Sequence, residues 1–393
     1  MKKTTLIASL AALAASATAS GVVHAQSSVT LYGVVDAGVT YISNQKTSGN
    51  AGGKSFSLSS GNIDTDRWGL RGVEDLGGGL SAIFTLENGF NLSNGKFNNA
   101  GDEFGRSAFV GLNSAQYGQV TLGRQEDSIE TFVAPLAATS FAGNLASHPF
   151  DSDNLTNQVR LNNSVMFRSR DYSGAQFGGG YAFSDLASGF RKNNAFTVGA
   201  KYDRNNFSVA AAFLQANDPG GAISGNTNSG ALTSSDGDAL LLGQRQRVYA
   251  GALNYRFSRA VVGATVTRTS LDGPRQISSG GVYVPLTGNW ITLWNYELHA
   301  RYSITPALRI GGAYTYTRGH FEGFGSSASP DWNTLVLQAD YALSRRTDVY
   351  LEGVYRRVTG DTASALSTAG VFNFGTSASN HQAVVTVGLR TKF

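Results

Sequence analysis

The 393-residue chain contains no cysteine. No disulfide bond can therefore stabilise it, and its cohesion must come from backbone hydrogen bonds and packing. Proline is also rare, with 7 residues, whereas glycine reaches 48 and tyrosine and phenylalanine number 16 and 22. This balance indicates an all-β chain rich in aromatic side chains.

Long hydrophobic runs are missing as well. No run of 18 apolar residues follows residue 25, which excludes a transmembrane helix. No stretch shows convincing 3.6-residue spacing of apolar residues, so the helices usual in a soluble domain of this size are not expected.

Clusters of basic residues are absent too. Lysine and arginine total 31 against 27 acidic residues, a formal net charge of +4, and no five basic residues adjoin one another. Because the charges are scattered, nucleic acid is not an expected partner.

The first 25 residues have the features of a secretory signal peptide. Lys2 and Lys3 precede an apolar, alanine-rich stretch at 6–19, and the segment ends in the small-residue pattern of Val23 to Ala25. We therefore predict a signal peptide at 1–25 and a mature domain at 26–393. Loss of the two lysines lowers the formal net charge by two, from +4 to +2.

Apolar and polar residues alternate with a period of two in many short segments. Between 80 and 87, for example, Leu80, Ala82, Phe84 and Leu86 share one face. Such alternation predicts strands of a sheet with one apolar and one polar face. Sixteen segments of this kind begin near residues 28, 62, 79, 106, 118, 158, 174, 194, 206, 245, 259, 291, 307, 332, 347 and 381.

The connectors between these segments alternate in length. Short ones at 75–78, 202–205 and 343–346 predict tight hairpins. Long polar connectors lie at 43–61, 91–105, 217–244, 270–289, 319–331 and 358–380. Short turns at one end, long loops at the other and an even strand number are typical of outer-membrane barrels. We therefore predict an all-β fold, a 16-stranded antiparallel transmembrane β-barrel.

Residue parity predicts which charges face the lumen. With Trp68 and Leu70 toward lipid, Arg67 and Arg71 face inward. A one-residue slip would send both arginines into hydrocarbon, at about 2–4 kcal/mol each near the midplane. By the same parity, Glu87 faces the lumen.

Two further arginines follow from the strand near 158. Val159, Leu161, Val165 and Phe167 share an apolar face there. The alternate residues, which include Arg160 and Arg168, should therefore point into the lumen.

Around Arg106 the parity is ambiguous. An outward Phe109 would turn Arg106, Ala108 and Val110 inward, whereas an outward Val110 would reverse this. The residues alone leave both directions open.

Several strings resemble a known family. Arg67 begins RWGLRGVEDLGGG, FTLE follows at 84–87, RSAFVGL starts at Arg106, GRQ starts at Gly123, and VTLYG starts at Val29. Together they resemble the trimeric general porins of Gram-negative bacteria, most closely the beta-proteobacterial and neisserial branch. The resemblance covers the mature chain and is densest over 28–170. It implies a sixteen-stranded barrel, a homotrimer, and a third loop folded inward to constrict the pore.

The resemblance also assigns a site. These porins have an inward arginine at the position of Arg106, and Arg67, Arg106 and Arg160 match the basic cluster that faces the third loop. The matching loop is 125–157, whose 33 residues show no sustained alternation, and a loop of this length indicates a function. It lacks the acidic Pro-Glu-Phe-Gly signature of enterobacterial porins. The opposing acid therefore stays open among Glu126, Asp127, Glu130, Asp151 and Asp153. The expected pore constriction comprises Arg67, Arg71, Glu87, Arg106, Glu126, Asp127, Arg160 and Arg168.

Two alternative functions can be weighed. An outer-membrane enzyme, such as a phospholipase or protease, would need a base and a nucleophile on one rim. The histidines after the leader, His148, His299, His320 and His381, lie in no nucleophile or metal motif, so neither an enzyme nor a cofactor is expected. A sugar channel would show an aromatic track in the lumen, and the inward Tyr32 and Tyr350 do not make one. Solute selectivity created by loop 125–157 stays open.

The expected function is a general diffusion porin for small hydrophilic solutes and ions in the outer membrane of a Gram-negative bacterium. Its expected partners are two further copies of the chain, outer-membrane lipid and lipopolysaccharide. A modest anion preference is expected because basic residues outnumber acidic ones on the inward faces. The basic ones are Arg67, Arg71, Arg106, Arg160, Arg168, Lys201, Arg301, Arg309, Arg356, Arg390 and Lys392, and the acidic ones are Asp36, Glu87, Glu297, Asp340, Asp348 and Glu352.

Overall fold

A computed structural model describes residues 27–48, 51–185, 189–219, 230–232, 241–279, 282–323, 327–361 and 366–393. The expected signal peptide lies outside these residues. Within them, the large sheet consists of β1 (Ser28–Lys46), β2 (Gly52–Ser60), β3 (Arg67–Gly77), β4 (Leu80–Gly89), β5 (Ser107–Ser114), β6 (Gly118–Gln125), β7 (Leu161–Ser169), β8 (Ala175–Ala182), β9 (Asn194–Arg204), β10 (Phe207–Asn217), β12 (Arg245–Phe257), β13 (Ala260–Asp272), β16 (Trp290–Ser303), β17 (Leu308–Glu322), β18 (Pro330–Ala342), β19 (Thr347–Gly360) and β20 (His381–Lys392).

The helical segments are all short. They are η1 (Asn99–Gly101), η2 (Ile129–Val133), η3 (Ala134–Leu136), α2 (Thr139–Ala142), η4 (Gly143–Ala146) and η5 (Pro149–Asp151). Within the described ranges, no helix combines the length and the apolar character needed to cross a membrane.

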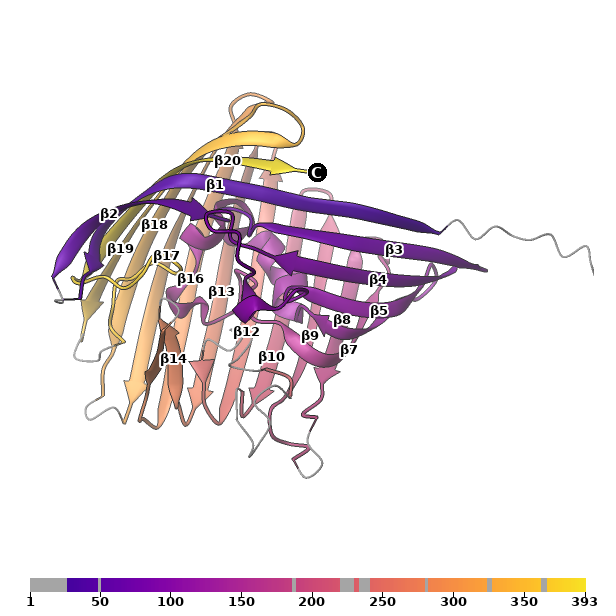
Figure 1. The fold of residues 1–393 in the computed structure, drawn as a ribbon, viewed down its shortest axis with the longest axis horizontal. Helices are drawn as coiled ribbons and strands as arrows, with labels where there is room; N and C mark the ends of the chain where they lie inside the picture. The colour runs from indigo at the N-terminus through magenta and orange to yellow at the C-terminus, as the bar shows by residue number, and fades with distance from the viewer. Residues whose placement is uncertain are drawn as a thin grey trace, which may run out of the picture.

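The large sheet closes on itself as a barrel (Figure 1). Neighbouring strands are antiparallel, and the last strand, β20, pairs with the first, β1. β2 and β3 share one position in the ring because both pair with the other edge of β1, β3 over Ser28–Val34 and β2 over Ala37–Lys46. The ring therefore has sixteen strand positions, which confirms the predicted fold.

The second strand position is interrupted, which the sequence analysis did not predict. The expected connector 43–61 instead contains the end of β1 and all of β2. Phe56 and Leu58 of β2 project outward, with 74% and 57% of their surfaces exposed. Between β2 and β3, residues 61–66 leave the wall and enter the lumen, where Asn62 donates a hydrogen bond to Tyr350 of β19. We call residues 61–66 the inward turn.

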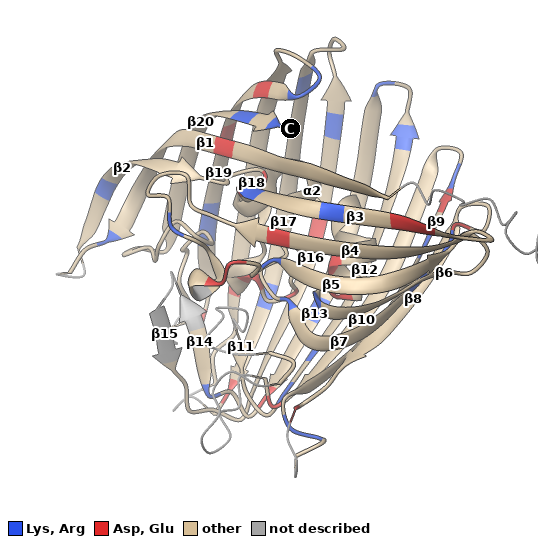
Figure 2. Ribbon diagram, turned by 45° about the vertical axis from the view of Figure 1, so that its right-hand side comes forward, with Lys and Arg blue, Asp and Glu red and all other residues tan. Residues whose placement is uncertain are grey.

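The two faces of the wall differ as a transmembrane barrel requires. Apolar side chains such as Val110, Leu298 and Val387 are more than half exposed on the outer face, where lipid would cover them. Figure 2 shows charged residues as separate short bands on the strands with long uncharged stretches between them, and polar side chains such as Thr267 and Asn295 are buried inside the ring. This pattern confirms the predicted alternation of an apolar outer and a polar inner face.

Residues 126–160 connect β6 to β7 and fold into the interior of the barrel (Figure 1). We call them the internal segment. Ile129 and Phe132 pack against inward-facing alanines of β10 and β12, while Phe141 and Leu145 pack against the inner face of β17–β20. Burial of these side chains holds the segment inside the barrel, as the resemblance implied for 125–157.

The long connectors are more structured than their composition suggests. β11 (Leu241–Leu242), β14 (Gln276–Ser279) and β15 (Val282–Pro285) come from two of them and form a small separate sheet. In the connector 217–244, Ala231 and Leu232 are buried, and Ala231 exchanges backbone hydrogen bonds with Asn162 and Asn193. Residues 230–232 are therefore held by burial and backbone hydrogen bonds within a connector that is polar in composition.

Candidate functional site

A narrow cavity of about 290 Å³ lies between the wall and the internal segment. Its charged lining comes from Asp64 of the inward turn, Arg67 of β3, Glu87 of β4, Arg106 before β5, and Glu126 with Glu130 of the internal segment. These charges meet in one cavity because β3, β4 and β5 are neighbours in the sheet and the internal segment folds across their inner face.

The narrow cavity joins two larger hollows. One of about 490 Å³, toward the short turns, shares Glu87 and Glu126 with it. The other, of about 710 Å³ and toward the long connectors, shares Arg106 and Asn157 with it. The three hollows therefore follow one another through the barrel along the wall of β1–β6, and the narrow cavity is the smallest of the three.

Two guanidinium groups share one carboxylate in the narrow cavity. Arg106 Nε lies 2.7 Å from Glu87 Oε1, and Arg67 Nε lies 3.7 Å from Glu87 Oε2. The Tyr32 hydroxyl donates to the same Oε2 at 2.8 Å. Arg67 and Arg106 are therefore held together at this point of the cavity by Glu87, and Asp64 of the inward turn lies 3.8 Å from Arg67 as a second acid.

Arg106 points inward for a reason that parity cannot supply. β5 begins one residue later, at Ser107, so Arg106 lies in the bend before the strand. Within β5, Val110 and Leu112 are exposed on the outer face and Phe109 lines the lumen. Of the two alternatives, Val110 is the residue that faces outward. Arg106 nevertheless points inward, because it lies before the strand and does not follow the strand's alternation.

The internal segment brings two of the candidate acids to the narrow cavity. Glu126 and Glu130 both line it, and Glu126 accepts a hydrogen bond from Asn157 at 2.8 Å. Burial and the charge of Glu126 raise the pKa of Glu130 well above its ordinary value, which favours its neutral form. Glu126 and Glu130 are therefore the two candidate acids that line the narrow cavity opposite the arginines.

Asp127 has a different position from the one expected. It is fully buried, and its Oδ1 accepts hydrogen bonds from the backbone N–H groups of Ile129 and Glu130 at 2.6 and 3.1 Å. Its Oδ2 accepts one from Asn154 at 3.0 Å. Asp127 therefore holds the first turn of the internal segment together instead of presenting its charge to the lumen.

The three remaining arginines are divided between two places. Arg160 is buried, with 1% of its surface exposed, and its Nε donates to the backbone oxygen of Arg106 at 2.9 Å. This hydrogen bond therefore positions the backbone of Arg106. Arg71 and Arg168 are exposed and line the larger hollow toward the short turns, where Arg71 lies over the ring of Tyr32 at 4.6 Å.

A buried ionic anchor, which the sequence analysis did not predict, fixes the internal segment to the opposite wall. His148 Nδ1 lies 2.6 Å from Asp153 Oδ2, and its Nε2 lies 3.4 Å from Glu297 Oε2 on β16. Burial lowers the pKa of His148, but the carboxylates of Asp153 and Glu297 outweigh it and raise the pKa to about 10.

Wall residues extend this anchor. Asp153 Oδ2 also accepts hydrogen bonds from Thr267 and Asn295, and Glu297 Oε1 accepts the backbone N–H of Ala138 at 2.9 Å. Asp153, a candidate constriction acid, is thus part of the anchor. Asp151, another candidate, is buried and accepts the backbone N–H of Thr156 at 3.2 Å. In the part of the chain that the structure describes, no group of three or more potential ligands is arranged to hold a metal ion.

Comparisons with known proteins agree with this geometry. A family model described as Gram-negative porin matches residues 10–362. An outer membrane porin protein of Bordetella pertussis is 30% identical over 401 residues, covering 94% of this chain and 98% of that protein.

Solved structures share the fold. An anion-selective porin from Comamonas acidovorans superposes with a TM-score of 0.68 at 22% identity, covering 94% of this chain and all (100%) of the other. The outer membrane protein OmpT of Vibrio cholerae, in a trimer form, gives a TM-score of 0.64 at 13% identity, covering 93% and 99% of the two chains.

Proposed function

This chain belongs to the Gram-negative porin family, and from the charges of its lumen we propose that this outer-membrane diffusion channel has a modest preference for anions. Small hydrophilic solutes and ions would pass through the three connected hollows. The narrow cavity, with Arg67, Glu87 and Arg106 opposite Glu126, would be the constriction.

The anion preference rests on one observation, the unpaired arginines on the lumen side of the wall. Arg71, Arg168 and Arg301 form no ion pair with any described residue, and neither does Arg256, which lies in the same row of the sheet as Arg301. The inward acids Asp340 and Asp348, by contrast, are paired with arginines. Unpaired cations raise the local concentration of anions.

Reversal potentials of the wild-type channel test this proposal. In a gradient of dilute KCl we expect a potential of the sign that shows excess chloride permeability. The preference should fade as salt rises, because the Debye length shrinks from about 30 Å at 0.01 M to about 3 Å at 1 M. A wild-type channel that prefers potassium in dilute salt would contradict the proposal and leave the porin fold untouched.

We also propose a homotrimer. The Vibrio cholerae protein named above is described in a trimer form. The outer faces of β1 and β3 carry Val29 and Trp68, which could pack between subunits, whereas Gly33 is covered by the ring of Phe393. The purified protein should migrate at three times the mass of one chain after cross-linking in mild detergent. A native mass of one chain would contradict the trimer.

The remaining expectations stay proposals. Residues 1–25 would be removed on export, and outer-membrane lipid and lipopolysaccharide would contact the apolar outer face. An enzymatic function is not proposed. Among the described histidines, His320 contacts the hydroxyl of Ser329 at 2.8 Å, but it lies 3.6 Å from Glu322, beyond hydrogen-bond length.

A further inference from the structure

The inward turn is a built element of the lumen. Asp36 of β1 accepts the backbone N–H groups of Ile63 and Asp64 on its Oδ2, at 2.8 and 3.0 Å. Asp66 accepts hydrogen bonds from the Asp36 backbone N–H and from the Ser60 hydroxyl. Two buried carboxylates therefore fix both ends of the turn to the wall.

The turn is also docked against the internal segment. The Asn144 backbone N–H donates to the oxygen of Asn62 at 3.0 Å, and its side chain donates to the oxygen of Gly61 at 2.9 Å. Gly143 has φ +48°, and a Cβ there would lie 2.3 Å from the Ile63 oxygen. Only glycine accommodates both the backbone conformation and this approach.

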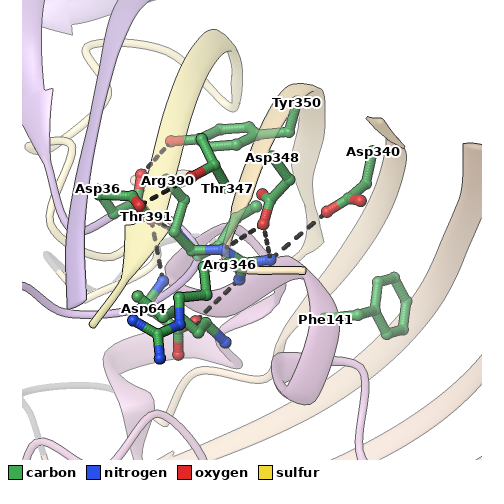
Figure 3. Close-up of polar contacts among 12 residues, drawn as sticks. Asp36, Asp64, Phe141, Asp340, Arg346, Thr347, Asp348, Tyr350, Arg390 and Thr391 are labelled. Atoms are coloured by element: carbon green, nitrogen blue, oxygen red, sulfur yellow. Dashed lines mark hydrogen bonds and ion pairs between the residues drawn. The ribbon is translucent and has the colours of Figure 1, made fainter. Parts of the chain in front are cut away.

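This docking places Asp64 between cations from two parts of the wall. Its Oδ2 lies 2.8 Å from Arg390 Nη1 and 3.1 Å from Lys392 Nζ, both on β20. Its Oδ1 lies 3.8 Å from Arg67 Nη2 on β3. Figure 3 shows Arg390 between Asp64 on one side and the acids of β18 and β19 on the other.

The partners of Asp64 depend on it to different degrees. Arg390 has a second carboxylate, Asp348, at 3.1 Å, and Arg67 has Glu87. Lys392 has no other ion-pair partner among the described residues. Removal of the Asp64 charge would therefore release Lys392 completely and weaken the neutralisation of Arg67.

We propose that Asp64 is a selectivity-determining residue, a carboxylate that the inward turn holds in the narrow cavity and that limits the anion preference set by the surrounding cations. The cavity is lined by Asp64 and Arg67 together, so a permeating ion passes both. This inference rests on the proposed conduction path, but it concerns a change in selectivity and does not need the wild-type sign.

Asp64→Asn tests the inference, because asparagine keeps the size of the side chain and removes its charge. Loss of a negative charge beside the conduction path favours chloride and disfavours potassium, so the chloride-to-potassium permeability ratio in dilute KCl should rise by roughly twofold or more. Asp272→Asn is the matched control, since Asp272 also bridges two arginines, Arg245 and Arg247, but away from the narrow cavity. It should change the ratio much less.

A double variant separates charge from shape. Asp64→Asn combined with Lys392→Gln removes one charge of each sign, so the ratio should return close to the wild-type value. An unchanged ratio in Asp64→Asn would overturn the inference. So would a large rise in conductance that the double variant retains, because the turn would then act by its bulk. A wild-type channel that prefers cations would contradict the proposed anion preference. A shift of the permeability ratio toward chloride in Asp64→Asn would still support the role of Asp64 in that case.

Discussion

Replacement of both Arg67 and Arg106 with alanine is expected to shift the channel strongly toward cations. The change removes two positive charges from the narrow cavity and leaves Glu87, among the residues that the structure describes, with the Tyr32 hydroxyl as its remaining close partner. Each charge is worth about 1 kcal/mol at 4 Å even at the dielectric constant of water. The chloride-to-potassium permeability ratio in dilute KCl should therefore fall by on the order of tenfold, with a slightly larger conductance.

A matched control exists for this double variant. Arg245 and Arg247 also share one carboxylate, Asp272, at 2.7 and 3.0 Å. They lie at the start of β12, outside the lining of the narrow cavity. Arg245→Ala with Arg247→Ala removes the same charge and should shift the reversal potential only slightly. Equal shifts in the two double variants would mean that total charge, and not the narrow cavity, sets selectivity.

The second large effect is expected for His148→Ala. His148 is the cation between two buried carboxylates, Asp153 and Glu297. Removal of one member of a buried ionic cluster costs about 3–5 kcal/mol, because the remaining charges are left uncompensated. The apolar contacts of Ile129, Phe132 and Phe141 should keep the rest of the internal segment in place. We therefore expect the part of the segment near His148 to detach.

Single-channel recording and liposome swelling would reveal this detachment. His148→Ala should give a larger and noisier conductance and should admit larger sugars, while the barrel still assembles. His320→Ala is the control, because His320 also pairs with a glutamate, Glu322, but is well exposed to solvent. Wild-type conductance and sugar cut-off in His148→Ala would show that the anchor does not hold the segment.

The wall of the barrel was predictable because alternation is a local signal. The directions of Arg67 and Glu87 followed from it directly. The same signal was present in Phe56-Ser57-Leu58-Ser59, now part of β2, but the pattern was short and bordered by glycine. The inward turn could not be predicted, because it depends on contacts with residues as distant as Tyr350.

The roles of the acids in the internal segment were beyond sequence reasoning for a related reason. Glu126 and Asp127 are adjacent in the chain, yet one lines the narrow cavity and the other accepts backbone hydrogen bonds. Composition cannot separate these roles, since both depend on the local fold of the segment. One signal was available: Ala210 and Ala212 hold inward positions where a polar residue was expected, and they mark the surface on which the segment packs.

Because the internal segment packs on these inward alanines, the size limit for solutes could change between related proteins without a change in the barrel wall. The internal segment and the inward turn occupy much of the lumen, and the described hollows follow one side of the wall. The size limit for solutes is then set by two elements that contribute no strand to the ring. A few substitutions in 61–66 or 126–160 could widen or narrow the passage without new strand pairing, so strand number alone is a poor guide to permeability.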